Sequence, residues 1–252
     1  MRPGSRWVAP AGVETVPFDF EDPDTFAAAL DGIDKIFLMR PPAISDASLF
    51  GALFLQARAS GVKQVVFMSL LGAEKNKLVP HRGIEDRLKA SGLGWTFLRP
   101  SFFMQNLSTT HAPEIRDENQ ILVPSGQGRT SFIDGRDIAA VAVKTLTDDG
   151  HLFKAYDLTG SEALRYRDVA AILSRELGRT IRYDSPGLLR FCLHMRKRKF
   201  PWAQIAVMGA IYTVVRLGQA GTVSPVLQQL LGRPPITLAQ FAKDYRQTWI
   251  PA

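Results

Sequence analysis

A histidine and a serine are the residues of this sequence that best suit proton transfer. His81 stands at the start of a predicted helix over residues 80–90, and Ser69 ends the β-branched run V-K-Q-V-V-F-M-S. An imidazole titrates near neutral pH, so His81 can donate a proton to a carbonyl-type oxygen. Alternatively, His81 bonds only solvent or backbone, and the Ser69 hydroxyl satisfies a loop amide. Glu85, one turn after His81, either orients the imidazole or is a solvated carboxylate on the helix face.

Three predicted strands end in polar or proline-rich corners. In open parallel sheets, ligands bind outside the carboxyl ends of the strands. A binding site is therefore expected at these corners, which are Met39-Arg40-Pro41, Ser69-Leu70-Leu71-Gly72 and Arg99-Pro100-Ser101-Phe102-Phe103.

Side chains at these corners suit the recognition of a flat, charged molecule. Phe102 and Phe103 can stack on a planar ring, and Arg40 can contact a phosphate. Core packing explains the two phenylalanines equally well, and a solvated Arg40 is the ordinary alternative. Gln105 and Asn106 follow shortly afterwards and add amide groups near the third corner.

The sequence lacks the residue patterns that several other common enzyme reactions require. The sequence has no Y-x-x-x-K pair and no G-x-S-x-G nucleophile elbow. His111, His151 and His194 are scattered without metal-ligand spacing, so no metal is expected. Cys192 is the single cysteine, which excludes an intramolecular disulfide and favours a reducing, cytoplasmic location.

The order of the predicted elements indicates an α/β protein with a parallel sheet flanked by helices. The second half of the sequence is less regular and ends in a mostly helical stretch. We expect two regions packed as one globular unit, residues 1–155 with the main sheet and residues 156–252 as a mostly helical lobe. In the first region, strands are expected at Val13–Phe20, Asp34–Met39, Val62–Ser69 and Trp95–Arg99.

The bulk composition is that of a soluble globular protein. Of 252 residues, 46% are hydrophobic and 22% charged, and the net charge is +7. Much of the positive charge lies in H-M-R-K-R-K, from His194 to Lys199, but no nucleic-acid motif accompanies it, so no nucleic-acid partner is expected. The uncharged run at residues 200–215 is too short to span a membrane. We favour a buried cap or dimer-contact helix there, and contact with a membrane surface is the alternative.

Four longer stretches together resemble the NmrA-like group of atypical short-chain dehydrogenases. They are P-H-R-G-I-E-D-R-L-K-A-S-G-L-G-W-T-F-L-R-P-S-F-F-M-Q-N-L, F-I-D-G-R-D-I-A-A-V-A, A-Y-D-L-T-G-S-E-A-L and L-L-G-R-P-P. The resemblance runs from about Val13 to the C-terminus. It implies a Rossmann-type sheet that binds NAD(P), with a small C-terminal substrate lobe. Some members of the group are NAD(P)H reductases of quinones or azo compounds, and others are redox-linked regulators.

The resemblance also implies roles for the corner residues. His81 and Ser69 would be the catalytic residues, and Phe103, Gln105 and Asn106 would contact the substrate. The cofactor would be held by Met39, Arg40, Pro41, Ser69, Leu70, Pro100, Ser101, Phe102 and Phe103.

The family's glycine-rich turn, G-x-T-G-x-x-G, is missing from this sequence, although such a turn normally binds the cofactor's pyrophosphate. Arg2-Pro3 resembles the end of the second strand of the family. Either translation starts further upstream or the Rossmann sheet is genuinely truncated at its N-terminal end. In the 252-residue form we expect NAD(P)H binding to be weak or absent. We also expect unpaired strand edges to make this form marginally stable or prone to aggregation.

The expected function is NAD(P)H-dependent reduction of a small planar acceptor such as a quinone. The alternative is a non-catalytic dinucleotide sensor or a protein-interaction module. The family fold alone does not choose between an enzyme and a sensor. A homo-oligomer is compatible with either function.

Overall fold

The structure is a computed structural model that describes residues 10–251. By its internal contacts the chain divides into two compact units. Unit 1 comprises Met1–Arg99 and Ala142–Tyr156, and unit 2 comprises Pro100–Val141 and Asp157–Ala252. The expected boundary near residue 155 coincides with the last passage of the chain from unit 1 to unit 2. Residues 100–141, which were expected in the first region, are part of unit 2.

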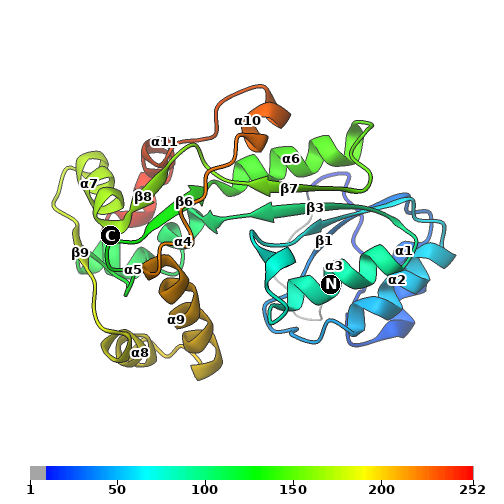
Figure 1. The fold of residues 1–252 in the computed structure, drawn as a ribbon, viewed down its shortest axis with the longest axis horizontal. Coiled ribbons are helices and arrows are strands. Elements are labelled where there is room, and N and C mark those ends of the chain that lie inside the picture. Colours follow the sequence, from blue (N-terminus) through cyan, green and yellow to red (C-terminus); the bar gives the residue numbers. More distant parts are fainter. Residues whose placement is uncertain (1–9, 252) are drawn as a thin grey trace. The chain divides into compact units, whose positions relative to one another are not determined.

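A sheet with parallel strands forms the centre of unit 1 (Figure 1). Its strands lie in the order β1 (Lys35–Met39), β2 (Gln64–Met68), β3 (Gly94–Pro100) and β7 (Lys154–Leu158). The β1–β2 and β2–β3 pairs are parallel. The first four residues of β2 are buried, as expected for a β-branched central strand covered on both faces. The α/β fold with a parallel sheet flanked by helices is confirmed.

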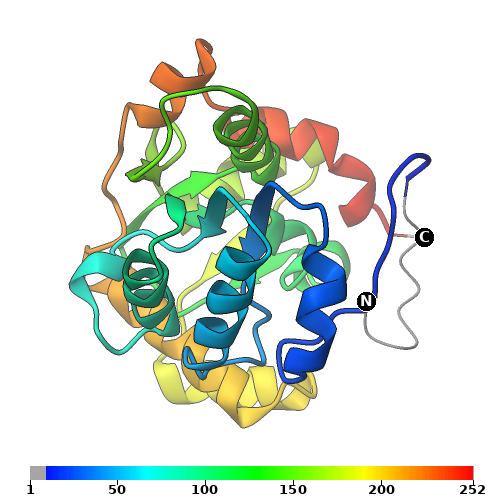
Figure 2. The same ribbon diagram turned by 90° about the vertical axis from the view of Figure 1, so that its right-hand side faces the viewer.

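Three helices cover one face of this sheet. They are α1 (Phe26–Leu30), α2 (Leu49–Ala59) and α3 (Pro80–Ala90), and Figure 2 shows them side by side in that order. Short 3-10 turns precede α1 and α3, namely η1 (Pro23–Thr25) and η2 (Ala73–Lys75). The apolar sides of the three helices form one core with Val65 and Phe67 of β2. On the other face, the Gln64 side-chain amide donates to the carbonyl of Thr145, near the end of α6 (Gly135–Thr147), at 3.1 Å.

The predicted strand over Val13–Phe20 is wrong. This segment contains only an isolated bridge between Asp19 and Asp22. No described strand lies beside it, and a single extended segment without a neighbour cannot form sheet hydrogen bonds. β1 is an edge strand of the described sheet, and its Phe37 and Met39 are 38% and 51% exposed. Arg2-Pro3 lies outside the described residues.

Unit 2 combines two small sheets with several helices. One sheet has the order β4 (Phe102–Phe103), β6 (Arg129–Ile133) and β8 (Ala163–Arg165), and the other pairs β5 (Gln120–Leu122) with β9 (Arg182–Asp184). The part after residue 156 is mostly helical, as expected. The helices of unit 2, besides the start of α6, are α4 (Gln105–Ser108), α5 (Ala112–Asp117), α7 (Tyr166–Leu177), α8 (Leu188–Lys197), α9 (Trp202–Arg216), α10 (Val226–Leu231), α11 (Leu238–Asp244) and the 3-10 turn η3 (Arg246–Trp249).

The uncharged run that begins at Phe200 forms helix α9. One side of α9, with Ile205, Gly209, Tyr212 and Val215, is buried in the core of unit 2. Its other side is exposed, so the expectation of a buried helix holds for one face only. Within the described part of the chain, no helix has the length and apolar composition needed to cross a membrane.

Candidate active site

The carboxyl ends of the parallel strands of unit 1 lie next to one another. Met39 of β1 is in register with Met68 of β2, which is in register with Leu98 of β3. Arg40, Ser69 and Arg99 therefore follow at the same edge of the sheet. The register thus brings together the ends of β1, β2 and β3 that the sequence singled out as a binding edge.

A buried hydrogen-bond network connects Ser69 to an ion pair. The Ser69 hydroxyl donates to Oε1 of Glu85 at 2.7 Å. The guanidinium of Arg99 donates to both oxygens of the same carboxylate, from Nε at 3.0 Å and from Nη2 at 2.7 Å. Nη1 of Arg99 also lies 3.2 Å from Oε2 of Glu74. Because the Ser69 proton is engaged with Glu85, the hydroxyl oxygen can accept a hydrogen bond from a ligand while its proton is held.

Glu85 is fully buried, so the expectation of a solvated carboxylate is wrong. Its position in the second turn of α3 places the side chain toward the ends of β2 and β3, where Ser69 and Arg99 bind it. The carboxylate makes its hydrogen bonds to these two residues, and no described hydrogen bond joins it to His81. Glu85 therefore fixes Ser69 and Arg99 in place and does not orient the imidazole directly.

His81 lies in the first turn of α3, directly after Pro80, whose ring favours the start of a helix. The imidazole stacks on Phe67 of β2 with ring centroids 6.0 Å apart. Nδ1 of His81 is buried and has no hydrogen-bond partner among the described residues. Burial and the nearby charge of Arg40 lower the pKa of His81 to about 4, with a smaller opposing effect from Glu85. The expectation that His81 titrates near neutral pH is therefore corrected, because the imidazole is neutral at pH 7.

Arg40 is half-buried and holds the loop after β1. Its Nη1 donates to the carbonyls of Pro41 at 2.9 Å, Pro42 at 3.2 Å and Ile44 at 2.5 Å, while its Nε is buried without a described partner. Burial lowers the pKa of Arg40. The guanidinium is thus not simply solvated, and its Nε is one polar group at this edge that a ligand can satisfy.

The other predicted residues of this edge differ in exposure. Met39 is half-exposed, whereas Leu70 is only partly exposed. The carbonyl of Leu70 accepts from the Ala73 amide at 3.1 Å, which starts the turn into η2. These two residues border the edge mainly through apolar atoms.

The predicted residues that follow β3 have clear structural contacts in unit 2. Pro100 is buried at the end of the strand. The backbone amide of Ser101 donates to the Leu158 carbonyl at 2.9 Å, and its hydroxyl donates to the carbonyl of Ser131. The Phe102 ring packs edge-on against Phe132 with centroids 5.6 Å apart. For Phe102 this favours the alternative of core packing.

The remaining predicted substrate residues differ in the burial and the hydrogen bonds of their side chains. Gln105 uses both ends of its amide at the start of α6: Oε1 accepts from the Gly135 amide at 2.9 Å, and Nε2 donates to Asp134 at 3.0 Å. Phe103 is half-buried and pairs through its backbone register with Ile133. The side chain of Asn106 is partly exposed, and its carbonyl accepts from the His111 amide at 3.0 Å. A substrate role for these three residues stays a prediction.

Sequence reasoning missed a buried carboxylate in unit 2. Glu114 of α5 is fully buried, and its oxygens contact Nδ1 of His111 at 3.1 Å, Nε2 of His194 at 2.7 Å and Nη1 of Arg198 at 2.8 Å. Nε2 of His111 lies 2.6 Å from the hydroxyl of Tyr212. Burial alone would raise the pKa of Glu114, but hydrogen bonds and charges from His111, Arg198 and His194 lower it. The only local signal was the H-x-x-E spacing, which puts His111 and Glu114 on one side of a helical turn.

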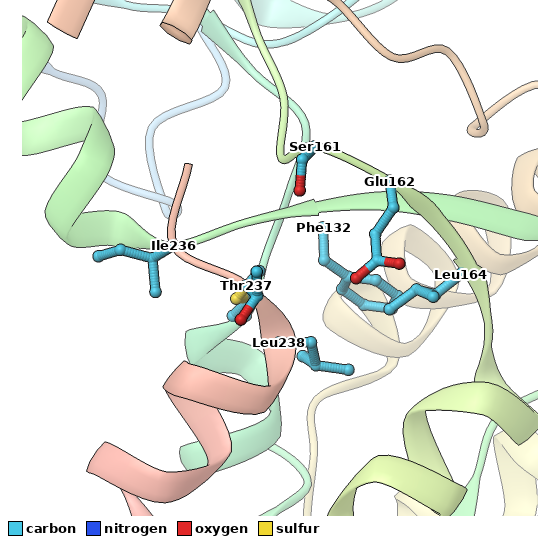
Figure 3. Close-up of a pocket in the computed structure, with 8 residues that line it drawn as sticks. Phe132, Ser161, Glu162, Leu164, Ile236, Thr237 and Leu238 are labelled. Carbon is cyan, nitrogen blue, oxygen red and sulfur yellow. The ribbon is translucent and has the colours of Figure 1, made fainter. Parts of the chain in front are cut away.

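Unit 2 contains a small cavity. It lies beside Phe132, Glu162 and Leu164, and across from them Thr237 and Leu238 begin α11 (Figure 3). Its volume is about 10 Å³, which accommodates roughly one water molecule. The cavity is therefore too small for a planar organic substrate. No cluster of metal-ligating side chains occurs among residues 10–251.

Comparison with known proteins identifies the family. The model of the NmrA-like family matches residues 3–193. The chain belongs to the NmrA-like family. The chain is 37% identical over 238 residues to the NAD(P)H azoreductase of Xenophilus azovorans. The match covers 93% of this chain and 83% of that protein.

Solved structures show the same fold. The NADPH complex of the NADPH-dependent quinone oxidoreductase of Escherichia coli matches with a TM-score of 0.82 and 25% identity, covering 90% of this chain and 81% of that one. NmrA itself, a negative transcriptional regulator in complex with NAD, matches with a TM-score of 0.68 and 15% identity, covering 88% of this chain and 76% of that one. The fold is thus shared by reductases and by a regulator in this family.

Proposed function

We propose that this chain is an NAD(P)H-dependent oxidoreductase that reduces a small planar acceptor such as a quinone or an azo compound. The observation that carries the proposal is the neutral imidazole of His81, whose buried Nδ1 has no described partner, beside the joined ends of β1, β2 and β3. The names of the related azoreductase and quinone oxidoreductase support this choice of acceptor.

The residues of unit 1 fit one part of an NAD(P)H molecule. One buried polar atom without a described partner, Nε of Arg40, belongs to a residue at this strand edge and is suited to a polar ribose group of the cofactor. Ser69 adds a hydrogen-bond acceptor, and Met39 and Leu70 add apolar contacts. The pyrophosphate lacks its usual partner, because the sequence contains no glycine-rich turn. We therefore keep the proposal that the 252-residue form binds NAD(P)H weakly or not at all.

The cofactor supplies a hydride when it is bound. The chain's own residues stabilise the negative charge that develops on the acceptor. A neutral imidazole is a hydrogen-bond donor, so the N–H of His81 stabilises the negative charge that develops on the acceptor oxygen or nitrogen. Phe67 fixes the plane of the imidazole by stacking. The pair of Glu85 and Arg99 holds Ser69, and because the Ser69 proton is engaged with Glu85, its oxygen can serve as a hydrogen-bond acceptor.

Replacing His81 tests this role. We expect His81→Ala to lower kcat/KM for reduction of a naphthoquinone by NADPH by about 10²-fold, because one donor to a developing anion is lost. His81→Gln should retain more activity than His81→Ala, because its amide is also a neutral donor. Since the imidazole is neutral above its pKa of about 4, the His81-dependent part of the rate should be constant between about pH 5 and 7.5.

The dissociation constant of NADPH separates the competing explanations for that result. It should be the same in both His81 variants and in the wild-type protein if His81 acts on the acceptor. A different result would mean that His81 is a protonated imidazole that gives its proton to the acceptor. In that case the activity would rise as the pH falls through about 6.5, and it would disappear equally in both variants. A protein that binds NADPH but turns over no acceptor would be the sensor of the alternative proposal.

A further inference from the structure

The outer face of helix α8 combines exposed leucines with basic side chains. Leu189 and Leu193 are one helical turn apart and 75% and 51% exposed. Arg190, Arg196 and Lys197 flank them and are exposed as well. The opposite face of α8 is anchored in unit 2 by Phe191 and Met195, which are completely buried. The orientation of α8 is therefore fixed, and its apolar and basic side chains project outward together.

An open groove runs along this face. Its volume is about 630 Å³, and the side chains of α8 line it together with Gln120 and Leu122 of β5. Leu122 belongs to the buried core and forms an apolar floor. Trp202, at the start of α9, is 57% exposed, and the guanidinium of Arg196 lies over its ring at 5.8 Å. We call Leu189, Arg190, Leu193, Arg196, Lys197 and Trp202 the α8 surface.

In the segment of the chain that contains α8, all charged side chains are positive over a long stretch. No aspartate or glutamate occurs between Asp184 and Asp244, whereas this stretch contains a run of four basic residues from Arg196 to Lys199. Of these, Arg198 is paired with the buried Glu114. Arg190 pairs with Asp184 at 2.9 Å. Arg196 and Lys197 have no acidic partner among the described residues, so the α8 surface carries unbalanced positive charge.

We propose that the α8 surface docks the protein on an anionic phospholipid bilayer. Exposed leucines and a tryptophan beside arginine and lysine are the combination that enters the interface of a bilayer, with apolar side chains below the headgroups and cations at the phosphates. A second copy of the chain fits less well, because a two-fold contact would bring the unbalanced cations of both copies together. The α8 surface consists of residues of unit 2, and the proposed reductase site consists of residues of unit 1, so the two proposals rest on different residues and stand independently.

Vesicle co-sedimentation with the full chain tests the proposal. We expect binding to vesicles of 70% phosphatidylcholine and 30% phosphatidylglycerol, at least tenfold weaker binding to pure phosphatidylcholine, and release by about 0.5 M salt, which screens the charges. Leu193→Glu and Lys197→Glu should each weaken binding to the anionic vesicles at least tenfold. Leu55→Glu is the matched control, because Leu55 is a 68% exposed helix leucine of unit 1, and it should bind like the wild-type protein.

Two further measurements show whether the variants are folded and whether Trp202 enters the bilayer. Thermal melts should show that the Leu193→Glu and Leu55→Glu variants are folded, and Trp202→Phe should remove the blue shift of tryptophan fluorescence on anionic vesicles. Equal sedimentation with neutral and anionic vesicles would overturn the proposal, and so would unchanged binding by Leu193→Glu. A wild-type dimer in light scattering that Leu193→Glu converts to a monomer, without vesicle binding, would assign the surface to a second copy.

Discussion

Replacing Glu85 with alanine should lower the free energy of unfolding of unit 1 by about 3–5 kcal/mol, the cost of removing one partner of a buried ion pair. Arg99 keeps a side chain that is only 10% exposed, and its bidentate partner is gone. Ser69 loses the acceptor of its hydroxyl as well. Urea unfolding followed by the fluorescence of Trp95, the only tryptophan of the described part of unit 1, measures the loss.

The next residue provides the control. Asp86→Ala removes an exposed carboxylate that pairs with Arg82 at 2.8 Å and should change stability by less than about 1 kcal/mol. The double variant Glu85→Met, Arg99→Met should be more stable than Glu85→Ala, because both charges of the bidentate pair are then replaced by apolar side chains. If Glu85→Ala were as stable as Asp86→Ala, the buried network would not hold this edge of the sheet.

Replacing Glu114 with alanine should destabilise unit 2 by a similar amount, about 3 kcal/mol or more. The carboxylate contacts side chains from the start of α5, from α8 and from the turn after α8, and the deletion leaves His111 buried without this partner. His194 and Arg198 are partly exposed and can turn toward solvent, which limits the loss. Asp117→Ala on the same helix is the control, since Asp117 is an exposed partner of Arg116.

The same carboxylate predicts a pH dependence. The folded-state pKa of Glu114 is lowered relative to the unfolded value, which is about 4.3 for glutamate. Its contribution to stability is therefore complete above that value and is lost as the pH falls through the folded-state pKa. Between about pH 5 and 3, the wild-type protein should lose more stability than Glu114→Gln, and thermal melts over this range measure the difference. Parallel losses would show that Glu114 is not the titrating group.

The elements of unit 1 that carry local signals could be predicted from the sequence. Helix α3 has the predicted bounds because a proline starts it and Ser91-Gly92 end it. β2 could be predicted from its β-branched residues. The segment Val13–Phe20 shows the limit, because a strand pattern is realised only when a neighbouring strand pairs with it. The register of β1, β2 and β3 then follows from the sheet, and it places Arg40, Ser69 and Arg99 at one edge.

The candidate site was less predictable than the fold. A carboxylate within a helix is usually solvated, so the sequence favoured a surface position for Glu85, and only tertiary packing places Arg99 and Ser69 against it. The pKa of His81 depends in the same way on burial and on Arg40, neither of which is visible in the helix sequence. Glu114 and its partner His194 lie far apart in the chain, so the local spacing of His111 and Glu114 could reveal only part of the cluster.

The strand ends of unit 1 are proposed to hold the dinucleotide of a reductase, and the 252-residue sequence contains no G-x-T-G-x-x-G turn. Fluorescence titration with NADPH and NADH tests this proposal most directly. The 252-residue chain is compared with a chain extended upstream by a strand, a G-x-T-G-x-x-G turn, a helix and a second strand. We predict saturable binding by the extended chain and weak or no binding by the 252-residue chain. Tight, saturable binding by the 252-residue chain, or no binding by either, would contradict the account.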